Sequence, residues 1–200
     1  MHVRITIIDG ATNIDGGIEY MKNEVIPGLR QQKGYRGISI SGDRTSGVVN
    51  VLAQWETQAD MDASESAIDK ARQEAVNVIG GKFTVERYEQ LMSETQAPGP
   101  SVGSKLHIRE IKMDPAKIND NLDFFKQVIV PEFKASKGFL GVRNLMNRTT
   151  GEGRVGTIWA DEASLQAQLA QTEARRTRAA DRGVQFGRDR LAEILFVAPD

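Results

Sequence analysis

Apolar residues recur at helical spacing in two segments of the chain that lie about a hundred residues apart. The first set is Ile18, Met21, Val25 and Leu29, and the second is Leu122, Phe125, Ile129 and Phe133. Spacings of three and four residues place each set on one face of a helix, so both segments are predicted to form amphipathic helices. Each segment contains one proline, Pro27 or Pro131, which is expected to interrupt its helix near the C-terminal end.

Short β-rich segments flank these helices. Residues 3–9 (VRITIID) and 106–113 (LHIREIKM) precede the two helices. Each helix is followed by a glycine-containing stop, KGYRG at 33–37 and KGFLG at 137–141, in which the first glycine suits a left-handed helix cap. Two strands joined by a polar, glycine-containing turn come next in both copies, which predicts a β-hairpin.

A second helix and a final strand complete each copy. The helix is expected to begin near Thr57 or Asp161, both acceptable N-caps, and to run to about Ile79 or Ala180. The final strand reads FTVERYEQLM in the first copy and RLAEILFVA in the second. The order β-α-β-β-α-β is that of a ferredoxin-like unit, whose antiparallel sheet carries its helices on one face.

The chain is therefore predicted to contain two copies of one structural unit. An offset of 104 residues brings Pro27 onto Pro131 and Trp55 onto Trp159. With one-residue slips, the segment His2-Val3-Arg4 also meets His107-Ile108-Arg109. The stretch SETQAPGPSVGSK between the copies reads as an exposed linker. We predict domains at residues 1–94 and 105–200, with a linker at 95–104.

The predicted fold class is α+β. Each sheet has one face covered by helices and a second face that still needs cover. Two ferredoxin-like units placed face to face bury both open faces, so we expect an intramolecular, pseudo-dimeric α+β barrel. A small-molecule cavity is expected where the open sheet faces meet.

Composition narrows the classes of function. The formal net charge is −1 among 200 residues, which argues against a partner that is a nucleic acid or an anionic membrane bound through bulk charge. The chain has no cysteine, so disulfides, thiolate metal sites and cysteine nucleophiles are excluded. Neither a signal peptide nor an apolar run of ~20 residues is present, and a cytoplasmic protein is expected.

Two stretches resemble a known family. GYRG, the hairpin and QWETQADMDAS in the first copy, with GFLG, the hairpin and IWADEASLQAQ in the second, are similar to the antibiotic biosynthesis monooxygenase (ABM) domain of the dimeric α/β-barrel superfamily. Most members of that family are single units that pair, so the resemblance implies two units paired within one chain. Further homo-oligomerisation of such chains is compatible with it.

The same family includes quinol monooxygenases that need no cofactor, and haem-degrading enzymes. The resemblance implies that Trp55 and Trp159 line a ligand pocket; plain core packing is the alternative for both. The haem-degrading branch uses a histidine on the second helix, yet DMDASESAID and SLQAQLAQTE contain none. An asparagine on the first strand is also missing, so haem degradation is the least favoured activity.

The chain has two histidines, and each stands two positions before an arginine on a predicted first strand. Side chains alternate along a strand, so His2 shares a face with Arg4, and His107 with Arg109. If these faces point inward, imidazole can act as a general base toward a phenol, and arginine can stabilise the developing charge. The alternative is that all four are polar residues at strand ends. Asn144 is a further polar pocket candidate.

The leading hypothesis is an ABM-like protein that binds a small aromatic molecule and oxygenates a phenolic or quinol-type substrate without metal, flavin or other cofactor. The alternative is a non-catalytic ligand-binding or structural barrel. Because the two copies differ at several aligned positions, such as Asn50 against Arg154, any activity can be housed in one half only.

Overall fold

A computed structural model describes residues 1–199 of the chain. Contacts between residues divide it into two compact units. Unit 1 consists of Met1–Tyr88 and the chain from Glu193 onward, and unit 2 consists of Glu89–Ala192. Each unit has its own helices and its own buried hydrophobic clusters.

The elements of the first half follow the predicted order. They are β1 (His2–Asp9), α1 (Ile14–Tyr20), the π-helical turn η1 (Met21–Val25), α2 (Ile26–Arg30), β2 (Tyr35–Asp43), β3 (Val48–Trp55), α3 (Gln58–Ala63), α4 (Glu65–Ile79) and β4 (Lys82–Thr95). The side chain of Thr57 accepts a hydrogen bond from the backbone N–H of Asp60 at 3.1 Å, so the predicted N-cap is confirmed.

The second half repeats this order. Its elements are β5 (Lys105–Lys112), the short 3₁₀ turn η2 (Pro115–Lys117), α5 (Ile118–Phe124), the π-helical turn η3 (Phe125–Ile129), α6 (Val130–Ala135), β6 (Phe139–Met146), β7 (Glu152–Trp159), α7 (Glu162–Ala170), α8 (Thr172–Ala180) and β8 (Gln185–Pro199). Asp161 caps α7 by accepting a hydrogen bond from the N–H of Ser164 at 2.8 Å, as predicted.

The predicted interruption of the first helix in each half takes the form of a π-helical turn. η1 ends one residue before Ile26-Pro27, and η3 ends one residue before Val130-Pro131. Proline has no N–H to donate, and its ring crowds the carbonyl one turn earlier. The wider π turn places an extra residue in the helix at this point, and the helix then continues past the proline.

The predicted second helix is broken in two in each half. In unit 1 the break falls at Ser64, whose hydroxyl donates to the carbonyl oxygen of Met61 at 2.7 Å. Such bonding back to the preceding turn competes with the regular helix. In unit 2 the break falls at Gln171, whose N–H donates to the carbonyl of Gln168 at 3.0 Å.

Gly34 and Gly138 have positive φ angles of 72° and 77°, but they are not the caps of the first helices, because α2 is capped at Gln31 and α6 at Ser136. Each glycine lies in the turn that follows, before β2 or β6 begins. The carbonyls of both glycines accept hydrogen bonds from the residue after the tryptophan strand, Glu56 at 2.7 Å and Ala160 at 2.8 Å. The turn after the first helix is therefore tied to the end of β3 or β7.

Replacing Gly138 by alanine is expected to lower the free energy of unfolding by about 2 kcal/mol, because a Cβ is strained at this φ and would overlap the side chain of Ser164. The matched control is Gly28→Ala in α2, where a Cβ meets nothing within 4 Å and helix propensity improves. Urea unfolding should show lower stability for the first variant and unchanged or higher stability for the second. Equal effects of both substitutions would contradict the requirement for glycine in this turn.

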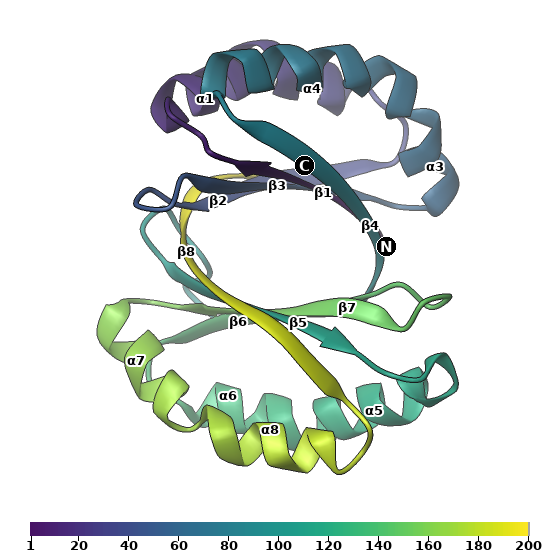
Figure 1. Cartoon of the computed structure of the whole chain (residues 1–200), viewed down its shortest axis with the longest axis vertical. Coiled ribbons are helices and arrows are strands. Elements are labelled where there is room, and N and C mark those ends of the chain that lie inside the picture. Colours follow the sequence, from purple (N-terminus) through teal and green to yellow (C-terminus); the bar gives the residue numbers. More distant parts are fainter. Residues whose placement is uncertain (200) are drawn as a thin grey trace. The chain divides into compact units, whose positions relative to one another are not determined.

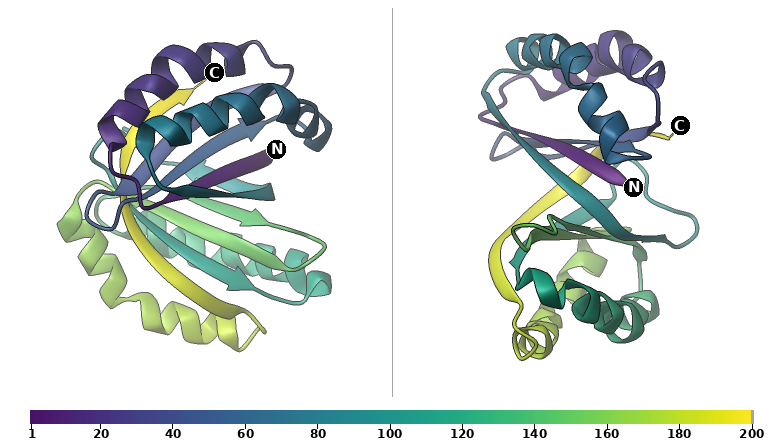
Figure 2. Two further views of the ribbon diagram at one scale, coloured as in Figure 1. Left: turned by 45° about the horizontal axis from the view of Figure 1, so that its top comes forward. Right: turned by 90° about the vertical axis from the view of Figure 1, so that its right-hand side faces the viewer.

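The sheets are antiparallel. In unit 1, β3 pairs with both β1 and β2, with His2 opposite Trp55. In unit 2, β7 pairs with both β5 and β6, with Lys105 opposite Trp159. Helices lie over one face of each sheet: α1 and α4 over that of unit 1, and α5 to α8 over that of unit 2 (Figure 1; Figure 2 gives two further views).

The last strand of each half is long, and its two parts belong to different compact units. In β4, Glu89–Thr95 pair with residues 141–146 of β6 in unit 2. In β8, Glu193–Pro199 pair with residues 37–42 of β2 in unit 1. The chain therefore passes from one compact unit to the other between Tyr88 and Glu89, and again between Ala192 and Glu193. The predicted linker, at 96–104 in the structure, is a loop within unit 2 that joins β4 to β5.

The strand pairings form one closed order, β1-β3-β2-β8-β5-β7-β6-β4. The fold class is thus α+β, with two ferredoxin-like units whose strands form the predicted barrel. Within residues 1–199, no helix combines the length and the apolar character needed to cross a membrane.

Candidate functional site

A cavity of about 100 Å³ lies within unit 2, between the helix-facing side of the sheet and the helices that cover it. Its apolar wall includes Ile118, Phe124, Phe125, Phe133 and Met146. Its polar wall includes His107, Arg109, Asn144, Thr157, Gln168 and Arg175. A site of this kind, apolar with a few convergent polar groups, is typical of small-molecule binding.

Strand alternation explains why these residues meet. His107 and Arg109 are two residues apart on β5, so both point to the helix-facing side. Their antiparallel partners on β7 are Thr157 and Val155, which point to the same side and line the same cavity. Asn144 on β6 is paired with Val155 and joins them there.

His107 is 4% exposed and stands between Gln168 and Asp189. Arg175 can only donate, and its Nη1 donates to Oε1 of Gln168 at 2.7 Å. The amide nitrogen of Gln168 consequently faces Nδ1 of His107, at 3.3 Å. Nδ1 is therefore the acceptor, and the neutral imidazole carries its proton on Nε2, which lies 3.2 Å from Oδ1 of Asp189.

Electrostatics keep His107 neutral and Asp189 ionised. Burial, reinforced by the charge of Arg109, lowers the pKa of His107, and Asp189 only partly offsets this. Burial works against ionisation of Asp189, but Arg109 donates to both its carboxylate oxygens, at 2.6 and 2.8 Å, and the pKa of Asp189 is lowered overall. Nε2 lies within ion-pair distance of Asp189 but without the geometry of a hydrogen bond, so the anion and the imidazole are adjacent, as in a general-base site, and are coupled here by charge.

The lowered pKa of His107 predicts a pH dependence of stability. The unfolded chain binds a proton near the ordinary histidine pKa of about 6.5, whereas the folded chain does so only at lower pH. Stability is thus complete above that value and is lost as pH falls below it. Urea unfolding at pH 7.5 and 5.5 should show this loss in wild type and in His2→Gln, but much less in His107→Gln. An unchanged loss in His107→Gln would contradict the assignment.

Asn144 presents an unused acceptor. The side chain is 6% exposed, and its Oδ1 has no hydrogen-bond partner within the described chain. A buried polar atom without a partner costs about 1–3 kcal/mol, and such an atom at a cavity wall marks a place where a ligand or water completes the bonding.

The structure distributes the sequence-predicted residues unequally. His107, Arg109 and Asn144 come together around the cavity of unit 2. Arg4 lines a separate, smaller cavity within unit 1, so Arg4 and His107 do not line the single cavity that was predicted. His2 lies at the start of β1, opposite Trp55, and lines neither cavity.

Trp55 and Trp159 are completely buried and line neither cavity. Trp159 packs edge-on against Phe139, with ring centroids 5.6 Å apart, and its Nε1 donates to Thr157 at 3.0 Å. Trp55 packs edge-on against Tyr35, with centroids 5.7 Å apart. In this structure both tryptophans are core residues, and Trp159 supports the cavity from behind, through Thr157 and Phe133.

The sheet register corrects the pairing of the two His-Arg segments. Arg4 is opposite Ala53 on β3, and His107 is opposite Thr157 on β7. Ala53 and Thr157 each lie two residues before a tryptophan, so Arg4 is the counterpart of His107 and not of Arg109. By the same register, His2 corresponds to Lys105. The sequence comparison of His2-Val3-Arg4 with His107-Ile108-Arg109 was therefore two residues out of structural register.

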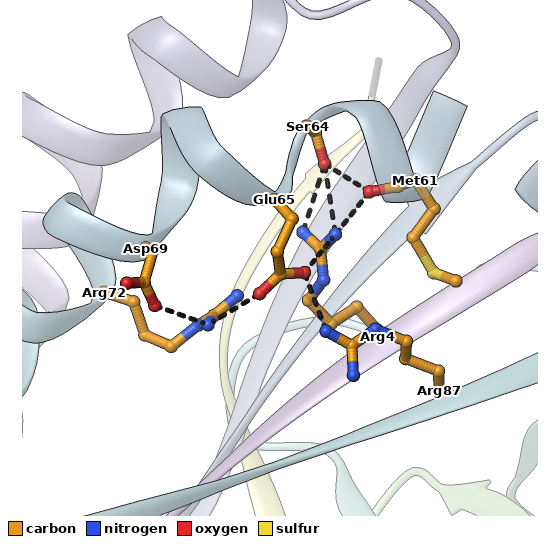
Figure 3. A network of polar contacts seen from close by, with 7 residues as sticks. All are labelled: Arg4, Met61, Ser64, Glu65, Asp69, Arg72 and Arg87. Carbon is orange, nitrogen blue, oxygen red and sulfur yellow. Dashed lines mark hydrogen bonds and ion pairs between the residues drawn. The ribbon is translucent and has the colours of Figure 1, made fainter. Parts of the chain in front are cut away.

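The counterpart in unit 1 is occupied by an ion-pair network. Nη2 of Arg4 lies 2.9 Å from Glu65, and its guanidinium also contacts Ser64 and the carbonyl of Met61. Glu65 also binds Arg72 at 3.0 Å and Arg87 at 2.8 Å, so three guanidinium groups converge on one carboxylate (Figure 3). This leaves a cavity of about 50 Å³.

Several residues of the unit 2 site were not predicted from the sequence. Gln168 and Arg175 come from α7 and α8, Asp189 from β8, and the phenylalanines from the first helix. The phenylalanine spacing in the first helix was a visible signal, but it reads equally well as core. Among residues 1–199 no cluster of three His, Asp or Glu side chains is arranged to hold a metal ion.

No protein-family model matches the chain. The uncharacterized protein Rv2558 of Mycobacterium tuberculosis (strain ATCC 25618 / H37Rv) is 25% identical over 199 residues, which are 99% of this chain and 81% of that protein. The uncharacterized protein Rv2557 of the same strain is 26% identical over 152 residues, or 76% of this chain and 67% of that protein.

Solved structures share the fold. An anthrone oxidase-like protein superposes with a TM-score of 0.71 at 13% identity, covering 99% of this chain and 92% of its own. A ferredoxin-fold protein of Listeria monocytogenes related to antibiotic biosynthesis monooxygenases gives 0.52 at 11% identity, covering 96% and 94%. A heme-degrading enzyme from the same species gives 0.53 at 10% identity, covering 96% and 99%. At these identities the likeness concerns the fold.

Proposed function

We propose that unit 2 binds a small phenolic, quinol-type molecule in the cavity beside His107 and oxygenates it without a metal or flavin. The observation that supports this most directly is the position of His107. It is a neutral imidazole, buried between Asp189 and Gln168, in the wall of a cavity that is also lined by phenylalanines. The fold shared with monooxygenase-related proteins is compatible with the proposal.

The cavity volume limits the ligand. An engineered protein cavity of about 150 Å³ holds one benzene molecule. At about 100 Å³, the cavity of unit 2 suits a single aromatic ring that fits with small shifts of the surrounding side chains. A haem macrocycle is far larger than this space.

The hydrogen bonding around His107 indicates how a phenol would be activated. Nδ1 is held only by the 3.3 Å contact from Gln168, which is longer than an ordinary hydrogen bond. A phenol O–H is a better donor and would replace that amide at Nδ1. Proton transfer to Nδ1 then leaves a phenolate, which can supply electrons to O₂, while Asp189 stabilises the imidazolium at Nε2.

Asn144 is expected to accept a hydrogen bond from the second hydroxyl of a hydroquinone, because the first donates to Nδ1 of His107. In calorimetric titrations, Asn144→Leu should bind hydroquinone about tenfold more weakly, because one hydrogen bond to a buried group is lost, while binding of toluene should be retained. The matched control is Asn77→Leu, the same change at an exposed position of α4. Equal affinity of wild type and Asn144→Leu for hydroquinone would contradict the site.

Catalysis and simple binding are separated by oxygen uptake. An oxygen electrode should record consumption by wild-type protein with hydroquinone and its loss in His107→Gln. The non-catalytic alternative, in which the same cavity only binds a ligand, is favoured if hydroquinone binds and no oxygen is consumed.

A further inference from the structure

The cavity of unit 1 differs in chemistry from that of unit 2. It is lined by Arg4, Arg72 and Thr6, and otherwise by apolar side chains such as Val25, Leu29 and Ile38. Arg4 is 3% exposed and Arg72 is 7% exposed. Two almost fully buried cations thus face a small, mostly apolar space.

Both arginines retain donors that nothing in the described chain accepts. These are Nε of Arg4, together with Nε and Nη2 of Arg72. Nη1 of Arg72 is fully used, since it contacts Glu65 at 3.0 Å and Asp69 at 3.3 Å. Figure 3 shows these contacts on one side of the Arg72 guanidinium, while its other terminal nitrogen has none. Buried donors without partners call for an acceptor in the cavity.

The local charge indicates an anion as this acceptor. Arg4 and Arg72 bring two buried positive charges, and Glu65, the carboxylate between them, is shared with a third arginine, Arg87. Burial lowers the pKa of Arg4, which Glu65 only partly offsets. Arg72 also contacts Asp69, but that carboxylate is 71% exposed, so its charge is screened by solvent. Water can accept the free N–H groups, whereas an anion in the cavity would also add negative charge beside the two buried guanidinium groups.

The size and lining of the space define the anion further. A cavity of about 50 Å³ is one third of the ~150 Å³ that holds benzene, so it accommodates a few non-hydrogen atoms only. Guanidinium groups match planar carboxylates, and the aliphatic wall suits a short alkyl group. We propose that unit 1 binds a short-chain carboxylate, of the size of formate or acetate, between Arg4 and Arg72.

The two units would then bind different classes of ligand at equivalent places. Where unit 1 has the permanently charged Arg4, unit 2 has the neutral His107. Where unit 1 has Ala53, unit 2 has Thr157, which adds a hydroxyl to its cavity. The carboxylate site depends on neither the phenol proposal nor any activity of unit 2.

The test is acetate binding to the whole chain of 200 residues. Binding is measured by the line broadening of ¹³C-labelled acetate and by the melting temperature, at constant ionic strength and with chloride as the reference anion. Wild-type protein should show saturable broadening and a higher melting temperature in acetate. Arg72→Met should bind acetate at least tenfold more weakly. Ala53→Leu, which fills the cavity and leaves both arginines in place, should abolish binding.

The matched control is Arg176→Met in unit 2. The guanidinium carbon of Arg176 lies 5.3 Å from the ring centroid of Phe186, much as that of Arg72 lies 5.7 Å from the ring centroid of Phe83. Arg176 lines the cavity of unit 2. Acetate binding that survives Arg176→Met but not Ala53→Leu supports the proposal. No saturable binding to wild type, an equal effect of chloride, binding that survives Ala53→Leu, or binding lost in Arg176→Met would each overturn it.

Discussion

Replacing Glu65 by glutamine is expected to lower the free energy of unfolding by about 3 kcal/mol. The substitution leaves Arg4 and Arg72 buried without their shared carboxylate, and removing one partner of a buried ion pair costs 3–5 kcal/mol. The lower end of that range applies because the side chain of Glu65 is 33% exposed, which allows water to screen part of the loss. Urea unfolding followed by circular dichroism measures the change.

Two controls separate this loss from a general effect of removing a carboxylate. Glu173→Gln, at a side chain that is 82% exposed and 3.7 Å from Arg176, should leave stability unchanged. The double variant Arg4→Met with Glu65→Leu removes both charges of the Arg4–Glu65 pair and should recover part of the stability, since apolar replacements of buried ion pairs are often neutral. The recovery is partial because Arg72 still lacks its carboxylate. A single-site loss that the double variant does not reduce would contradict the ion-pair explanation.

Replacing Trp159 by alanine is expected to lower the free energy of unfolding by about 3–5 kcal/mol, as for other large core residues. The ring is 0% exposed and lies between Phe133 and Phe139, at centroid distances of 6.2 and 5.6 Å. Its loss should also enlarge the cavity of unit 2 from the side of Thr157. Urea unfolding monitored by circular dichroism avoids dependence on the tryptophan signal that the change removes.

The matched comparison is tryptophan to phenylalanine in each unit. Trp159→Phe should cost about 1–2 kcal/mol, because packing is largely kept but the bond to Thr157 is lost. Trp55→Phe should cost less, since Nε1 of Trp55 has no acceptor within the described residues. If both substitutions cost the same, the bond to Thr157 makes no net contribution.

Much of the fold could be predicted because most of its helices, strands and turns are specified by local sequence patterns. The helical spacing that includes Ile129 and Phe133, the glycine stops and the N-caps at Thr57 and Asp161 are determined by nearby residues. The division of β4 and β8 between two units could not be predicted in this way. Strand pairing at such distances depends on tertiary packing, and the apolar alternation of a strand does not say which sheet takes each part of it.

The site was predicted only in part for the same reason. His107 and Arg109 were predicted because they share the parity of one strand, and Asn144 because it shares the parity of Val142 and Met146. All three line the cavity of unit 2, and their role stays a prediction. Gln168 and Asp189 come from a helix and a strand far along the chain, and no local pattern relates them to His107. The equivalence of Arg4 and His107 follows from the register of β1 against β3 and of β5 against β7. Matching the similar residue types in the sequence gave an alignment that is two residues out of this register.

Because β4 and β8 each contribute to both units, they determine how the chain can be divided into fragments. A fragment that stops in the loop at 96–104 includes all of β4, but it lacks the residues from Glu193 onward that pair with β2. Its β2 edge would be left with open backbone donors and acceptors, which is the usual starting point for aggregation. The natural way to divide this chain is therefore as a complementing pair of fragments, each insoluble or unfolded until the other supplies its edge strand.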